Sequence, residues 1–179
     1  MAEAAVKEEG KMDMQAAMEV YKKLAIPSAP HKLLAKMAGS WITKSKGWMD
    51  PSEPPMESEG TCEQKMILGD RYLYQEFSGD MMGTPFKGIG MVGYDNHTKK
   101  YVSTWMDDMS TGIYYFEGTA SKDGKTITQT CDYDDPVQGP MTWRAVSRYV
   151  DDDHMEFEMY GIDESGNENK MMEMTYTRK

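Results

Sequence analysis

The chain has 179 residues, of which 28% are charged and 39% are hydrophobic, and its formal net charge is −10. This length suits one domain with its own core, and no apolar run is long enough to span a membrane. The negative charge argues against nucleic acid as a partner. Because the first residues, MAEAAVKEEG, lack the apolar segment of a secretory signal, we expect a cytoplasmic protein.

Two short helices are predicted before the main domain. Residues 1–12 are polar and rich in Ala, Glu and Lys, which is typical of a flexible tail. The N-terminal helices are expected over 13–38: Asp13 caps the first, which ends near Leu24, and the second ends before Gly39. The first helix has one apolar face, which we expect to dock on the main body: Met14, Met18 and Tyr21.

Residues 39–179 show the pattern of an all-β domain. Short runs rich in Val, Ile, Thr, Tyr and Trp alternate with turn clusters such as YDNHTKK, SKDGK and DESGNEN. No helical pattern separates the runs, so neighbouring strands should be antiparallel. About ten strands are predicted: 41–49, 57–68, 71–79, 85–94, 100–107, 111–120, 125–134, 141–150, 154–162 and 169–178.

One predicted strand, FKGIGMVGY, contains three glycines, Gly88, Gly90 and Gly93. Glycine inside a strand is typical of a tight bend, such as the corner of a barrel. This strand therefore favours a closed barrel over a flat sandwich.

The last two predicted strands are rich in methionine, and alternation of side chains divides them into two faces. In HMEFEMY, the apolar face holds Met155, Phe157 and Met159. In MMEMTYTRK, Met172, Met174, Tyr176 and Arg178 share one face, whereas Met171 and Glu173 share the other. Flexible thioethers fill irregular cores and also adapt to apolar ligands, so core packing and ligand contact both stay open.

A set of phrases along the chain resembles a known family. The Gly39–Trp41 motif of MAGSW, together with Arg178 in the last strand, is similar to the lipocalin/calycin superfamily. The phrases MILGDRYL, GDMMGTPFKGIGMVGYDN, KKYVSTWMDDMSTGIYYFEGT and VDDDHMEFEMY resemble the bacterial family known as domain of unknown function 1579, over about residues 31–179. The resemblance implies a lipocalin-like antiparallel β-barrel in which Trp41 packs under Arg178 and closes the floor. It implies no reaction.

The first functional hypothesis is a binding protein for a small apolar or amphipathic molecule held in the barrel. Aromatic residues on the middle strands and the Met/Phe face of the last strands are the expected contacts. The predicted ligand-binding residues are Trp105, Trp143, Phe157, Met159, Met172 and Met174.

No catalytic, metal or cofactor site is predicted. The chain has no nucleophile elbow, HExxH or phosphate loop, and Cys62 and Cys131 do not form a CxxC. Two reduced thiols are favoured, with a disulfide as the open alternative. His154 is expected to face away from the Met/Phe side, which disfavours a haem ligand.

Two other classes of function stay open. An enzyme could use a buried carboxylate or arginine in the cavity, and the residues to consider are Glu76, Asp107, Asp108, Arg144 and Arg148. A filled barrel could instead serve as an interaction or assembly module, with residues 13–24 as the docking element. A homo-oligomer is compatible with each of the three hypotheses.

Overall fold

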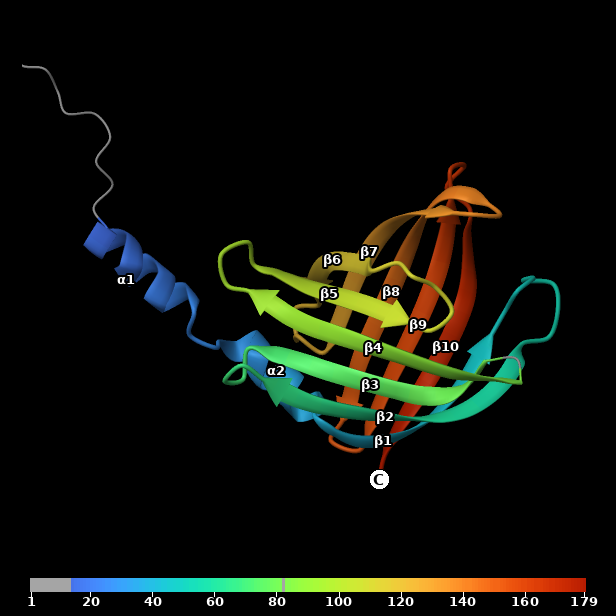
Figure 1. Ribbon diagram of the computed structural model, residues 1–179, viewed down its shortest axis with the longest axis horizontal. Helices are drawn as coiled ribbons and strands as arrows, with labels where there is room; N and C mark the ends of the chain where they lie inside the picture. The colour runs from blue at the N-terminus through green and yellow to red at the C-terminus, as the bar shows by residue number, and fades with distance from the viewer. Residues whose placement is uncertain (1–13, 82) are drawn as a thin grey trace, which may run out of the picture.

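The computed structural model describes residues 14–81 and 83–179, and these form two helices and ten strands (Figure 1). The expected tail over 1–12 and the Asp13 cap lie outside the described residues. The helices are α1 (Met14–Leu24) and α2 (Ala29–Met37). The strands are β1 (Gly39–Gly47), β2 (Met56–Ile67), β3 (Tyr72–Met81), β4 (Thr84–Asp95), β5 (Lys100–Asp107), β6 (Tyr114–Ala120), β7 (Thr126–Asp135), β8 (Gly139–Asp151), β9 (His154–Asp163) and β10 (Glu168–Arg178).

The strands form a closed antiparallel barrel in which each strand pairs with its neighbours in the sequence and β10 pairs with β1. This confirms the predicted fold class. Each expected strand end lies within two residues of the observed one, except that β6 begins at Tyr114 rather than at residue 111. Closure leaves no unpaired sheet edge among these strands.

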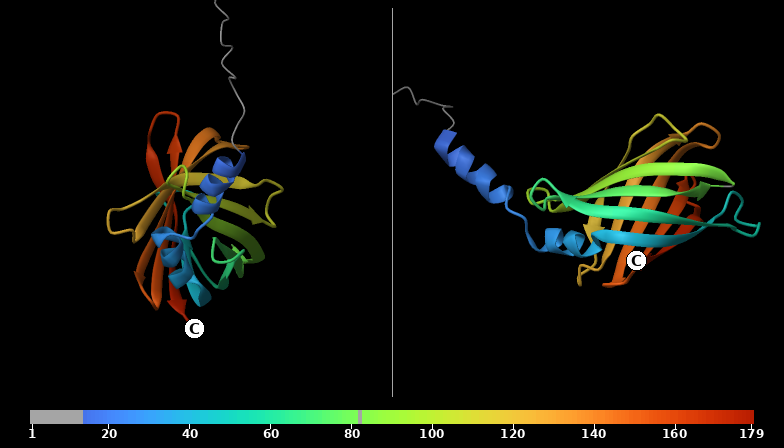
Figure 2. Two further views of the ribbon diagram at one scale, coloured as in Figure 1. Left: turned by 90° about the vertical axis from the view of Figure 1, so that its left-hand side faces the viewer. Right: turned by 60° about the horizontal axis from the view of Figure 1, so that its bottom comes forward.

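Helix α2 lies across one end of the barrel, which we call the floor (Figure 2). Its Leu34 and Met37 are buried in a cluster with Trp41, Leu73 and other inward side chains of the nearby strand ends. Apolar residues at positions 34 and 37 share one face of a helix, so this face covers the barrel while the lysines of α2 face solvent.

Trp41 and Arg178 close the floor. They are direct partners in the β1–β10 ladder, and Trp41 is fully buried. The Arg178 guanidinium lies 4.1 Å from the centre of the Trp41 ring and donates to the backbone carbonyls of Ala38 and Lys36. Gly39 permits this contact, because a Cβ there would lie 2.1 Å from the Arg178 guanidinium.

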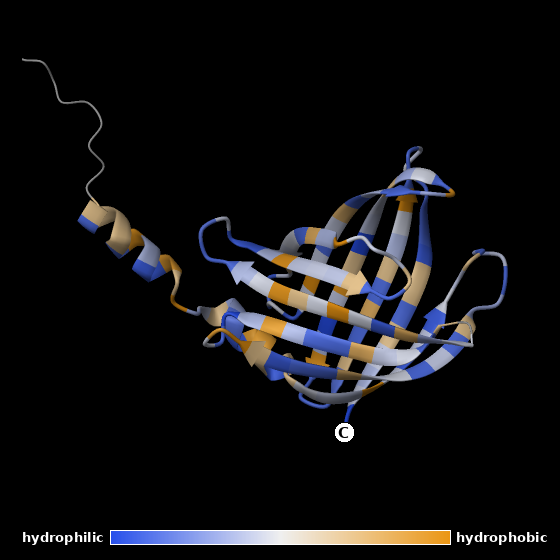
Figure 3. Ribbon diagram, in the orientation of Figure 1, coloured by the Kyte–Doolittle hydropathy of each residue, from blue (hydrophilic) through white to orange (hydrophobic). Residues whose placement is uncertain are grey.

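Helix α1 projects away from the barrel and buries none of its residues (Figure 3). Met14, Met18 and Tyr21 are 68%, 51% and 68% exposed. The expected docking of this apolar stripe on the main body is therefore wrong. An amphipathic pattern predicts that a face suits burial, but it does not identify what covers that face. Within the described ranges, no helix combines the length and the apolar character needed to cross a membrane.

A buried histidine fastens α2 to the barrel. His31 is 4% exposed, its Nδ1 accepts the Ser28 backbone N–H at 3.0 Å, and its ring also hydrogen-bonds the Tyr94 backbone. The Asn96 side chain donates to the carbonyls of Leu24 and Ile26. These contacts join the chain around α2 to the β4–β5 end of the barrel.

Burial lowers the pKa of His31 below its usual 6.5, and nearby Arg71 acts in the same direction. The unfolded chain therefore binds more protons than the folded chain as pH falls below 6.5, so stability should decline there. We expect urea unfolding to show a loss of at most about 1.4 kcal/mol per pH unit from this one group. His31→Gln should remove that slope. An unchanged slope in the variant would assign it to other groups.

Candidate ligand-binding cavity

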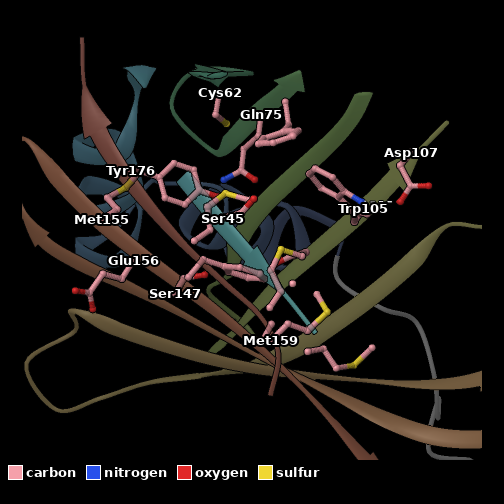
Figure 4. Close-up of a pocket in the computed structure, with 18 of the residues that line it drawn as sticks. Ser45, Cys62, Gln75, Trp105, Asp107, Ser147, Met155, Glu156, Met159 and Tyr176 are labelled. Atoms are coloured by element: carbon pink, nitrogen blue, oxygen red, sulfur yellow. Dashed lines mark hydrogen bonds between the residues drawn. The ribbon is translucent and has the colours of Figure 1, made fainter. Parts of the chain in front are cut away.

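The barrel is not filled: it contains a cavity of about 680 Å³ that runs from α2 towards the opposite end (Figure 4). Leu34 and Met37 lie at its floor. Its mouth is lined by exposed residues of the β1–β2 and β3–β4 connections, Met49 and Gly83, and by Met56 at the start of β2. This volume falls within the range of typical small-molecule pockets.

All six residues predicted as ligand contacts line this cavity. Met159 and Met172 are ladder partners, as are Phe157 and Met174, so β9 and β10 together form one continuous wall. Trp105 approaches from β5 on another part of the wall, as Figure 4 shows. Their convergence on one cavity is a fact of the structure, and their contact with a ligand stays a prediction.

Met171 also lines the cavity, which corrects its expected place on the outer face with Glu173. The β9–β10 register shifts between Lys170 and Met172, so β10 carries one extra residue there. Such a bulge interrupts strict alternation. The Met171 thioether consequently lies over Gly161 on the inner face of β9.

The Trp105 indole lies against the inner face of β4. A Cβ at Gly88 would lie 2.2 Å from this ring, and one at Gly90 would lie 3.1 Å from it. The indole N–H donates to the Asp107 carboxylate at 2.9 Å. These two glycines thus make room for the Trp105 ring, a role in addition to the expected bending of the strand.

Trp143 belongs to an aromatic group that sequence reasoning did not assemble. Its ring centre lies 4.3 Å from that of Tyr133 and 5.1 Å from that of Tyr114. The Trp143 N–H donates to the Met141 sulfur at 3.3 Å. Such packing holds the ring that borders the cavity in one orientation.

Uncharged polar side chains on the inner face were also missed. Gln64 and Gln75 are direct ladder partners on β2 and β3, and both line the cavity. Gln129 is buried and accepts the Ser103 hydroxyl at 2.6 Å. Alternation could have placed them there, because each glutamine shares the inward-facing positions of its strand.

The charged residues of the enzyme hypothesis do not converge inside the barrel. Arg144 of β8 pairs with Glu168 of β10, and Arg148 of β8 pairs with Glu156 of β9 at 2.5 Å. Arg148 and Glu156 lie at the edge of the cavity lining, but each already has the other as its charged partner. Glu76 is exposed on β3. Asp107 reaches the cavity, where it accepts the Trp105 N–H.

Both cysteines are buried and free, so the disulfide alternative is wrong. Burial raises the pKa of the Cys62 thiol from 9.0 to about 11, against an opposing hydrogen bond from Gln64. That change lowers the thiolate fraction at neutral pH about a hundredfold.

In a Cys131→Ser variant, we expect Ellman's reagent to react with Cys62 at least about a hundredfold more slowly in the native state than in guanidinium. Equal rates would contradict the burial of this thiol.

A closed antiparallel barrel with an interior cavity and a helix across its floor defines a lipocalin-like protein. The sequence model of one family, described as "Protein of unknown function (DUF1579)", matches residues 26–178. The chain therefore belongs to this family, which confirms the resemblance seen in the sequence. No curated protein matches the chain.

Two solved structures share the fold at low identity. Rv2717c from M. tuberculosis is 14% identical with a TM-score of 0.63, over 86% of this chain and 99% of that one. The S-type phycobiliprotein lyase CPES from Guillardia theta is 10% identical with a TM-score of 0.58, over 83% of this chain and 91% of that one. At these identities the similarity establishes the fold alone.

Proposed function

We propose that this protein binds a small apolar or amphipathic molecule inside its barrel. The observation that carries the proposal is the cavity of about 680 Å³, whose wall joins Trp105, Phe157 and the methionines of β9 and β10. Apolar walls with a few polar groups are typical of small-molecule sites. The fold is shared with a phycobiliprotein lyase, which is compatible with ligand handling and indicates no particular ligand for this chain.

The proposal is tested with N-phenyl-1-naphthylamine, an uncharged apolar dye whose fluorescence rises in apolar surroundings. We expect saturable binding to the purified protein, at one site per chain. Native mass spectrometry should also show a retained small molecule whose added mass disappears on denaturation. Absence of both signals would overturn the proposal.

A matched pair of variants on β8 locates the dye. Ser147 lines the cavity, whereas Val150 on the same strand is 40% exposed. Ser147→Trp should fill the cavity and weaken dye binding at least about tenfold, equivalent to about 1.4 kcal/mol. Val150→Trp should leave dye binding unchanged. Equal affinities in the two variants would place the dye outside the barrel.

A further inference from the structure

The part of the cavity wall formed by β2, β3 and β10 carries uncharged polar side chains, one of which has a buried oxygen without a hydrogen-bond partner. Gln64 is 6% exposed, and its Nε2 donates to Cys62 Sγ at 3.6 Å. Its Oε1 is the one buried side-chain N or O atom without a hydrogen-bond partner among the described residues. Burying an amide oxygen without a partner destabilises the empty barrel, and a ligand group that donates a hydrogen bond to Gln64 would remove this cost.

Two further polar groups lie on this wall. Gln75 faces Gln64 across the β2–β3 ladder, and Tyr176 enters from β10. Figure 4 shows Cys62, Gln75 and Tyr176 together in one part of the pocket, with Met159 in another. Burial raises the pKa of Tyr176 well above its usual range, so its phenol stays protonated and can donate or accept a hydrogen bond.

The charged residues of the cavity lining lie at the mouth or already have a partner. Glu57 and Asp80 are exposed on strand ends at the mouth, and Asp107 already accepts the Trp105 N–H. Arg148 is the one cation among the described residues of the lining, and it is already paired with Glu156, which also lines the cavity. A carboxylate head inside the barrel would therefore find no unpaired cation, and an ammonium head at the floor would find no unpaired carboxylate.

We propose that the ligand of this cavity carries an uncharged hydroxyl or carboxamide head that hydrogen-bonds Gln64, Gln75 and Tyr176. Its apolar tail lies along the wall of Trp105, Phe157 and the methionines. A hydroxyl or carboxamide both donates and accepts, which suits two side-chain amides and a phenol. This inference rests on the proposed binding function and adds the chemistry of the ligand head.

The test uses four competitors with the same tail: decanol, decanamide, decanoate and decylammonium. For each competitor we measure how well it displaces N-phenyl-1-naphthylamine from the full chain. The pH is chosen so that decanoate and decylammonium are both charged. We expect decanol and decanamide to bind at least about tenfold more tightly than either ion. If the dye binds but an ion competes as well as decanol, the neutral-head inference is overturned and the binding function stands. If the dye does not bind and native mass spectrometry shows no retained molecule, the binding function itself fails.

Variants then locate the head. Gln64→Met with Gln75→Met removes both amides while keeping unbranched side chains, and should weaken decanamide about tenfold with little change for the dye. Gln138→Met, in the exposed β7–β8 turn, is the matched control and should change neither affinity. If the double variant binds the dye normally and keeps its full preference for decanamide, the head does not lie at these glutamines.

Discussion

Trp41→Ala is expected to lower the free energy of unfolding by about 3–5 kcal/mol, which is typical when a large buried aromatic is removed. Trp41 is fully buried, its N–H donates to the Met37 carbonyl at 3.0 Å, and its ring lies under Arg178. The variant therefore loses apolar burial, a hydrogen bond to α2 and the contact that joins the first and last strands. Urea unfolding followed by circular dichroism measures the effect.

Two further variants separate these contributions. Trp48→Ala, one residue beyond the end of β1, is the control and should cost much less, because Trp48 is only partly buried. Arg178→Met keeps the stem of the side chain but leaves the Ala38 and Lys36 carbonyls without its guanidinium, which should cost about 1–3 kcal/mol. If Trp41→Ala and Trp48→Ala were equally destabilising, the floor would have no special importance for barrel closure.

The barrel could be predicted from the sequence because each strand carries a local signal. Turn clusters mark the ends of the runs, and alternation assigns an inner and an outer face. The wall residues Phe157, Met159, Met172 and Met174 follow from this alternation alone. The Gly39–Trp41 motif also predicted the closure of the floor, because the glycine leaves the space through which Arg178 reaches α2.

Other features depend on pairing between strands, which a single sequence does not contain. The bulge at Met171 arises from the β9–β10 register, and an extra residue looks like any other in the sequence. The space at Gly88 is explained only by the Trp105 ring of the next strand. For α1 the helix itself was predicted correctly from its apolar pattern, but the surface expected to cover its apolar face was wrong.

Gln64→Met is expected to stabilise the empty barrel by about 1–3 kcal/mol while weakening binding of a polar ligand. The amide oxygen of Gln64 is buried without a partner, so folding removes it from water without compensation. Methionine has a similar unbranched shape and no polar group that needs a partner, and it loses only the weak bond to Cys62. Each kcal/mol should raise Tm by about 2–4 °C in a domain of this size.

The comparison with Gln129→Met makes this prediction specific. Gln129 is equally buried, at 6% exposed, but its amide accepts the Ser103 hydroxyl and donates to the Phe116 carbonyl. Its removal leaves those two groups unpaired, so this variant should lower Tm, whereas Gln64→Met should raise it. A fall in Tm for both would mean that the Gln64 amide is satisfied in solution, for example by an ordered water. Opposite signs would instead indicate that the barrel keeps a destabilising amide on the cavity wall, which is the arrangement expected where a ligand supplies the missing hydrogen bond.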